Sequence, residues 1–90
     1  MEVKETKKGE TYLLSEVSIG STGTITKINA EGRLRRRILD MGITPNTQIF
    51  LRKKAPLGDP LEITIRGYEL TLRKEEASQI EIKVTDVREV

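Results

Sequence analysis

Strict alternation of apolar and polar side chains over residues 61–73 constrains the fold of this chain most strongly. In residues 61–65, and again in residues 68–72, every second side chain is apolar. A period of two places one side of a strand in a core and the other side in water. Gly67 can adopt the positive φ that a tight hairpin turn needs at its second central position. The two runs therefore predict a β-hairpin with its turn at Arg66-Gly67. The side chains expected in the core are Leu61, Ile63, Ile65, Tyr68, Leu70 and Leu72.

The segment before this hairpin cannot continue a strand ladder. Pro56 and Pro60 lack a backbone donor, and Gly58-Asp59 is typical of turns. Two interpretations remain open for this loop. It is either a connector that positions the next strand or a rigid surface that presents Leu57 to a partner. Composition alone favours the connector, because most connecting loops only connect.

Three further strands are indicated by β-branched or alternating segments. Residues 24–28 are rich in β-branched side chains, and residues 48–53 and 80–84 place aliphatic side chains at every second position. The segment Gly20–Gly23 is expected to be a turn. Residues 75–78 are expected to form at most one helical turn.

Residues 32–41 are the one convincing helix. Their apolar side chains recur at helical spacing and form a single stripe, made of Leu34, Ile38 and Met41. Gly42 follows directly and is a natural left-handed C-terminal cap. Arg37 lies at the edge of the stripe, so we expect its stem to pack on the core and its guanidinium to reach a carboxylate or a carbonyl. The face opposite the stripe carries Arg33, Arg36 and Asp40.

The count of about five strands and one short helix predicts a small barrel. At residues 44–47 a turn is expected, because Pro45 presets φ and Asn46 tolerates a positive φ. Short antiparallel strands with one buried face are most economically closed on themselves, since closure removes exposed edges. We therefore predict a mainly-β fold, an SH3-like β-barrel, with a five-stranded OB-type barrel as second candidate. We expect a flexible lead-in over residues 1–10, the barrel over 11–84 and a charged tail over 85–90.

The composition argues against several functions. The chain of 90 residues contains no His and no Cys, so the common general base, nucleophile and transition-metal ligands are missing. We expect no enzymatic activity, no cofactor and no metal site, and we expect Asp59, Glu75 and Glu76 to be solvated charges. No apolar run approaches the roughly 20 residues of a membrane span, and the first residues are too polar for a signal peptide. A cytoplasmic location is expected.

The arginines of the helix are the best argument for a nucleic-acid partner. Arg33, Arg35, Arg36 and Arg37 place four cations within five residues. The helical wheel scatters them over more than one face, however, and Asp40 shares the polar side. Aromatic residues for base stacking are scarce, with one Phe, two Tyr and no Trp. We therefore expect a protein partner and no nucleic acid. The same scarcity argues against an aromatic groove for proline-rich peptides.

An ordered set of motifs resembles the FeoA family. The motifs are R-R-I-L-D-M-G-I-T-P at residues 36–45, A-P-L-G-D-P at 55–60 and I-R-G-Y-E-L-T-L-R at 65–73. The patterns G-x-x-G-x-I upstream and E-A-x-x-I downstream extend the resemblance over residues 13–84. One departure is Asn46, where the family usually has Gly. Because Asn tolerates the same left-handed backbone, the departure is compatible with the fold.

The resemblance implies a small cytoplasmic protein of bacterial ferrous iron uptake. Its implied partner is FeoB, a membrane permease with a GTP-binding domain, and only this partner would bring the chain to the membrane. Self-association through exposed strand edges is a further expectation. The alternative is a nucleic-acid-linked regulatory module, similar to the C-terminal SH3-like domain of iron-dependent repressors. A stand-alone SH3-like domain that binds RNA is the third interpretation.

Two sets of residues are expected to matter, one for docking to a partner and one for the structure. The helix face and the proline-rich loop form the hypothetical docking surface, which comprises Arg33, Arg36, Asp40, Pro56, Leu57, Gly58, Asp59 and Pro60. The resemblance raises the docking interpretation of the loop to equal standing with the connector. Structural roles are expected for Arg37, Gly42, Pro45 and Gly67.

The hairpin turn gives a first testable prediction. Gly67→Val should lower the melting temperature, because a β-branched residue is forced toward positive φ. Thermal unfolding followed by circular dichroism measures the effect. An unaltered melting temperature would contradict the predicted turn.

Overall fold

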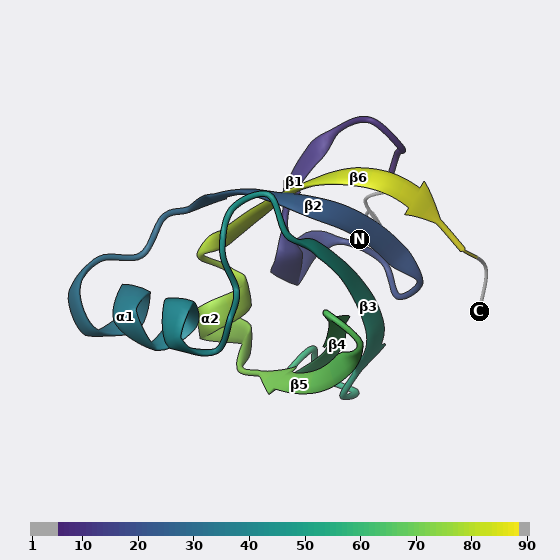
Figure 1. Ribbon diagram of the computed structural model, residues 1–90. Helices are drawn as coiled ribbons and strands as arrows, with labels where there is room; N and C mark the ends of the chain where they lie inside the picture. The colour runs from purple at the N-terminus through teal and green to yellow at the C-terminus, as the bar shows by residue number, and fades with distance from the viewer. Residues whose placement is uncertain (1–5, 89–90) are drawn as a thin grey trace.

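The computed structural model describes residues 6–88, which form six strands and two short helices (Figure 1). Strand β6 is the last element, and the chain is described as far as Arg88. In chain order the elements are β1 (Thr11–Leu13), the 3₁₀ turn η1 (Leu14–Glu16), β2 (Ser21–Ile28), α1 (Gly32–Asp40), β3 (Gln48–Lys54), β4 (Leu61–Ile65), β5 (Tyr68–Leu72), α2 (Lys74–Ala77) and β6 (Ile80–Val87).

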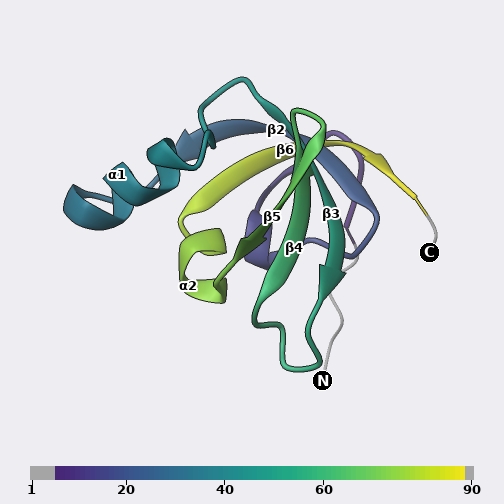
Figure 2. The same cartoon turned by 60° about the horizontal axis from the view of Figure 1, so that its bottom comes forward.

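The strands form one antiparallel sheet in the order β1-β6-β2-β3-β4-β5. The sheet curls around a central space, with α1 and α2 at one side (Figures 1 and 2). The predicted mainly-β barrel with one principal helix is confirmed. The sheet is not strictly closed, because β1 and β5 end the strand order without pairing with each other.

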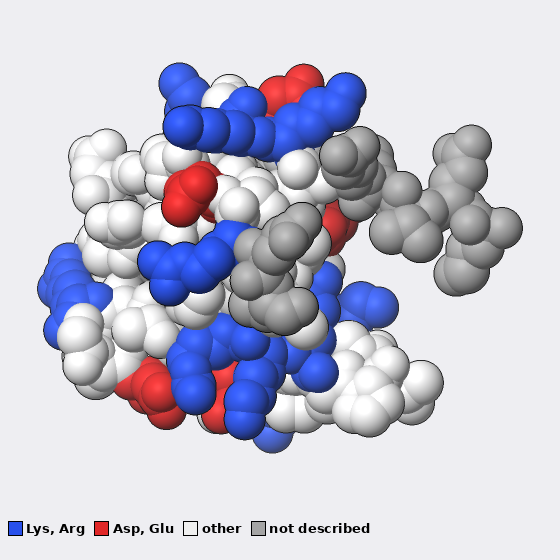
Figure 3. Space-filling view, turned by 90° about the vertical axis from the view of Figure 1, so that its right-hand side faces the viewer, with Lys and Arg blue, Asp and Glu red and all other residues white. Residues whose placement is uncertain are grey.

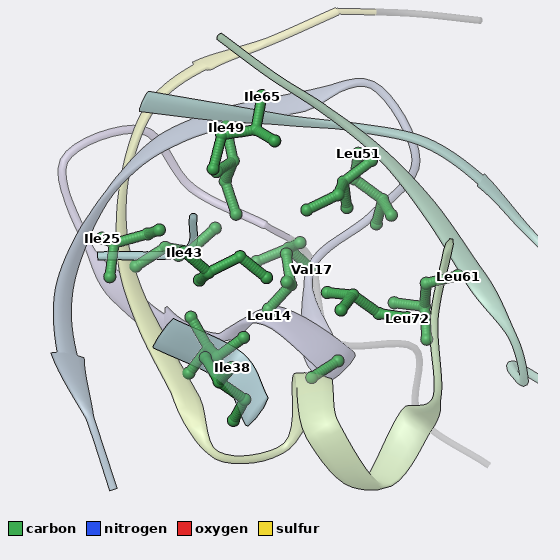
Figure 4. Packing of buried hydrophobic residues seen from close by; sticks show 14 of the residues in the cluster. Leu14, Val17, Ile25, Ile38, Ile43, Ile49, Leu51, Leu61, Ile65 and Leu72 are labelled. Atoms are coloured by element: carbon green, nitrogen blue, oxygen red, sulfur yellow. The ribbon is translucent and has the colours of Figure 1, made fainter. Parts of the chain in front are cut away.

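One aliphatic core fills the curled sheet. Figure 4 shows side chains from the strands meeting Ile38 of α1 and Leu14 of η1. Ile25, Ile38 and Leu61 have no exposed surface. A fully buried Leu or Ile contributes about 1.5–3 kcal/mol relative to an exposed one, so this core is the main source of stability. The buried hydrophobic residues are Leu14, Val17, Ile25, Ile28, Ala30, Ile38, Ile43, Ile49, Leu51, Leu61, Ile63, Ile65, Leu72, Ala77, Ile80, Ile82 and Val84.

The β4–β5 hairpin is confirmed, and the alternation in β4 matches its burial. The expectation that Tyr68 lies in the core is wrong: on the edge strand β5 it is 43% exposed and its hydroxyl donates to the carbonyl of Met41 at 3.2 Å, while Leu70 is only half-buried. Leu61 lies opposite Leu72, and Ile65 lies opposite Tyr68. Arg66 has φ 51° and Gly67 has φ 81°, so both central turn residues are left-handed, as a type I′ turn requires. The sequence assigned this conformation to Gly67 alone. A guanidinium nitrogen of Arg66 donates to the hydroxyls of Thr44 and Thr47, at 3.1 and 3.2 Å, and holds the turn against the preceding loop.

The predicted end of the helix is also confirmed. Gly42 has φ 86°, and the N–H groups of Met41 and Gly42 donate back to carbonyls of the last helical turn. Asn46 adopts φ 71° beyond Pro45, and the N–H of Thr47 donates to the carbonyl of Thr44. The left-handed positions expected after the helix are therefore present.

Three details of the sequence-based assignment are wrong. The expected turn at Gly20–Gly23 is strand from Ser21 onward, with a register shift between Thr22 and Gly23. The short strand β1 was not predicted, because three residues are too few to show an alternation of apolar and polar side chains. Strand β6 extends to Val87, past the expected start of the tail, because the first residues of β2 pair with it.

Part of the expected lead-in contacts the barrel. The N–H of Gly9 donates to the carbonyl of Val84 at 2.7 Å, and the hydroxyl of Thr6 accepts from the N–H of Ser18 at 2.9 Å. Residues 1–5 and 89–90 lie outside the described part of the chain. Within the described part, no helix is long and apolar enough to cross a membrane.

Gly23 gives a prediction for the packing of β2 on β6. A Cβ at this buried position would lie 2.9 Å from the carbonyl oxygen of Lys83 and 3.0 Å from a methyl carbon of Ile82. Gly23→Ala should therefore lower the free energy of unfolding by about 1–3 kcal/mol, measured by urea denaturation. The control is Thr24→Ala on the same strand, which should cost at most about 1 kcal/mol. Equal effects would contradict the close approach.

Candidate docking surface

A buried carboxylate, that of Glu76, connects the two helices. Glu76 is 3% exposed, although the sequence indicated a solvated charge. One carboxylate oxygen lies 2.8 Å from Nε of Arg37, and the other accepts from the N–H of Arg73 at 2.9 Å. A buried charge must be paired in this way, because an unpaired one is costly. The burial of Glu76 was not predicted from the sequence, because Arg73 is not a residue that normally begins a capping box.

Two of the four helix arginines contact this chain's own acceptors. Arg37 reaches Glu76, which is the carboxylate partner that its place on the helical wheel predicted. Arg35 donates to the carbonyl of Ile28 at 3.2 Å. Arg33 and Arg36 are exposed and form no ion pair with any residue of the described range 6–88. The basic cluster is therefore divided into two tethering and two free guanidinium groups.

The polar face of α1 has a shallow hollow of about 270 Å³. Half-buried Leu39 lies in it, and exposed Arg36 and Asp40 flank it. An apolar side chain bordered by opposite charges suits a protein contact, because the charges orient the partner and the apolar group contributes burial.

The loop between β3 and β4 is braced at its base and apolar at its tip. The N–H of Ala55 donates to the carbonyl of Pro60 at 2.9 Å, and the N–H of Gly58 donates to the carbonyl of Ala55 at 2.7 Å. Asp59 is exposed, yet its carboxylate accepts from the N–H of Lys74 at 3.0 Å. Leu57 is 89% exposed at the tip. The loop therefore presents an apolar side chain on a constrained backbone.

A half-buried lysine stands at the base of this loop. Lys54 donates to the carbonyl of Ser15 at 3.3 Å. Burial, with a smaller contribution from the charge of nearby Lys74, lowers the pKa of the Lys54 ammonium below its usual value.

The structure separates the two parts of the predicted surface. In Figures 1 and 2, α1 lies at one end of the barrel and the β3–β4 loop lies apart from it. Arg37 of α1 and the base of the loop, at Asp59 and Pro60, line the same pocket. It has a volume of about 510 Å³, and we call it the Glu76 pocket. Its lining residues are Arg37, Asp59, Pro60, Thr71, Arg73 and Glu76.

Neither surface resembles a metal centre. Within residues 6–88, the His, Cys, Asp and Glu side chains form no group of three or more that could hold a metal ion. The carboxylates of Glu76 and Asp59 accept from arginine and backbone N–H groups. This arrangement suits recognition by hydrogen bonds and charge.

Comparison with known proteins identifies the family. Residues 12–84 match the FeoA domain. This chain belongs to the FeoA family. It is 37% identical over 71 residues to the Fe(2+) transport protein A/Fe(2+) transporter FeoB fusion protein of Porphyromonas gingivalis, a match that covers 79% of this chain and 8% of that protein. The chain therefore spans a small part of the length of this curated relative.

Solved structures agree with the family assignment. The FeoA-like protein of Clostridium acetobutylicum is 41% identical, with a TM-score of 0.80 over 90% of this chain and 94% of that one. FeoA of Stenotrophomonas maltophilia, described as an SH3 domain protein complexed with zinc, is 22% identical over 77% of this chain and 86% of that one, with a TM-score of 0.66. At that identity the likeness shows the fold alone, and it confirms the predicted SH3-like barrel.

The ion pair of Arg37 and Glu76 gives a prediction for the placement of α1. Arg37→Met should lower the free energy of unfolding by about 1–3 kcal/mol, because it leaves a buried carboxylate without its cation. Arg36→Met is the matched control on the same FeoA helix, and its effect should stay within about 0.5 kcal/mol. Chemical denaturation measures both. Equal losses in the two variants would show that the ion pair does not hold α1.

Proposed function

We propose that this FeoA-family chain is a cytoplasmic accessory protein of ferrous iron uptake that binds an FeoB-type permease. The observation that carries the proposal is the fused relative, in which a transport protein A and the transporter FeoB share one polypeptide. Fusion keeps two modules at a high effective concentration, which is useful when the modules bind each other. In a separate chain, the same association would depend on a docking surface.

The proposed contact is centred on the polar face of α1 and the Glu76 pocket. Arg33, Arg36 and Asp40 supply exposed charges, and Arg37 turns one edge of its guanidinium to Glu76 while its side chain remains 59% exposed. Unpaired arginines beside a half-buried apolar residue are typical of interface anchors. The positions of these groups are fixed by the core and by the ion pair, so little ordering is needed on binding.

Leu57 forms a second, separate contact in this proposal. Its side chain extends from a loop whose base is hydrogen-bonded and contacts α2 through Asp59. An apolar side chain that is 89% exposed gains from burial against a partner, by roughly 1.5–3 kcal/mol when fully covered. The separation of Leu57 from α1 requires a partner that reaches around α2. A large permease meets this requirement better than a short peptide does.

Binding to the full-length, detergent-solubilised permease of the same organism tests the proposal. Arg36→Glu and Leu57→Ser should each weaken binding about tenfold, because each removes one anchor. The matched controls are Lys83→Glu, which makes the same charge change on β6, and Val87→Ser, which removes another exposed apolar side chain. Surface plasmon resonance with each folded variant measures the affinities. Binding that is unchanged in both anchor variants, or weakened equally in the controls, would reject this surface.

A nucleic-acid-linked role remains the competing interpretation of the sequence. Within the helix cluster, only Arg33 and Arg36 form no ion pair or side-chain hydrogen bond with residues 6–88, so the cluster itself offers few cations for phosphate contacts. Retention on a heparin column that falls steeply with salt would favour that role. Elution near physiological salt, with no dependence on Arg33, is the outcome expected for the permease accessory.

A further inference from the structure

A groove on the outer face of the sheet is separate from the docking surface. It has a volume of about 480 Å³ and crosses β2, β3 and β4 between the hairpin turn and the described end of the chain. Its walls carry Thr22, Phe50 and Thr64, and two arginines, Arg66 and Arg88, line it as well. The charged side chains on the side of the molecule seen in Figure 3 are mostly Lys and Arg.

Arg88 covers the one aromatic ring in this groove. Its guanidinium carbon lies 5.5 Å from the centre of the Phe50 ring, within the range of a cation–π contact. The N–H of Arg88 donates to the carbonyl of Gly20 at 2.9 Å, which fixes the backbone from which the side chain extends. The guanidinium is therefore held beside the groove and still has N–H donors at its edge.

Arg66 is oriented just as firmly at the hairpin turn. One of its terminal nitrogens donates to the hydroxyls of Thr44 and Thr47. Neither Arg66 nor Arg88 forms an ion pair with another residue between 6 and 88. Two exposed, oriented guanidinium groups without a carboxylate partner are an arrangement that suits an anionic ligand.

The register across the sheet limits the kind of anion. Thr22 lies opposite Phe50, and Phe50 lies opposite Thr64, so these three residues form one row over the groove. Two carboxylates flank the row: Asp86 lies opposite Thr22, and Glu69, which is paired with Arg52 at 2.8 Å, lies opposite Thr64. A continuous phosphate backbone along the row would meet the negative charge of Asp86 at one end, whereas Arg52 balances the charge of Glu69 at the other. A single carboxylate in the middle would meet hydroxyls and the arginines.

The aromatic ring points to the same class of ligand. Because Arg88 lies over the ring of Phe50, a nucleobase could stack on that side only after displacing it. The rest of the half-buried ring is suited to an aliphatic side chain. We propose that the groove binds an extended segment of a partner protein, with one Asp or Glu carboxylate between Arg66 and Arg88 and a neighbouring aliphatic side chain against Phe50.

Two capped hexapeptides test this proposal on the full chain. The first probe has the sequence Ala-Ser-Glu-Leu-Ser-Ala, and the second replaces its Glu by Gln. In a ¹⁵N NMR titration, the Glu peptide should shift the amide signals of Thr22, Phe50, Thr64 and Gly67. The Gln peptide should bind about tenfold more weakly, because the charge-assisted hydrogen bonds are lost.

Variants of the two arginines separate this groove from other surfaces. Arg66→Gln and Arg88→Gln should each reduce affinity for the Glu peptide by about tenfold, and Arg36→Gln on α1 should leave it unchanged. Both groove arginines are exposed, and the dispersion of the NMR spectrum checks that each variant is folded. Equal binding of the two peptides, shifts confined to other surfaces, or no shifts at millimolar peptide would overturn the proposal. Displacement of the Glu peptide by a thymidine oligonucleotide at lower concentration would also overturn it.

Discussion

The structure depends on one aliphatic core that every long strand and the principal helix share. A domain of this size has too few residues for a second core, so each strand must place one face toward the same side chains. Ile38 of α1 and Leu14 of η1 complete the core, which no strand could cover by itself. As a consequence, the outward faces of the strands and of α1 are left polar. The features that this leaves for contact with a partner are surface charges, hydrogen-bonded loops and a few exposed apolar side chains.

The carboxylate of Glu76 adds a directional constraint to this core. Burial of Ile38 attaches α1 to the barrel, but an aliphatic contact has little directional preference. The ion pair with Arg37 and the hydrogen bond from the N–H of Arg73 fix where α1 lies relative to α2. The free charges of Arg33 and Arg36 are then held at a defined place on α1, the helix whose Arg37 lines the Glu76 pocket. The proposed docking surface follows from this polar link as much as from its own residues.

Local patterns in the sequence predicted the elements that depend on local chemistry. The hairpin, the helix, the left-handed Gly42 and Asn46 and the inward side chains of β3 and β6 all follow from spacing and turn chemistry. Contacts between distant segments were not predictable in the same way. The burial of Glu76 requires α1 to pack near α2, and the contact of Arg88 with Phe50 requires β6 to extend along β2. The separation of Leu57 from α1 is likewise a consequence of the topology, which residue types do not encode directly.

Hydrogen–deuterium exchange of the full chain, with and without the full-length permease, tests the central claim most directly. The claim is that α1, placed by the Arg37–Glu76 ion pair, forms the contact with the partner. The account predicts slower exchange of amides in residues 33–40 and 71–76 when the permease is present. Unchanged exchange in α1, with slower exchange confined to β2 and β3, would contradict it and assign the contact to the outer face of the sheet.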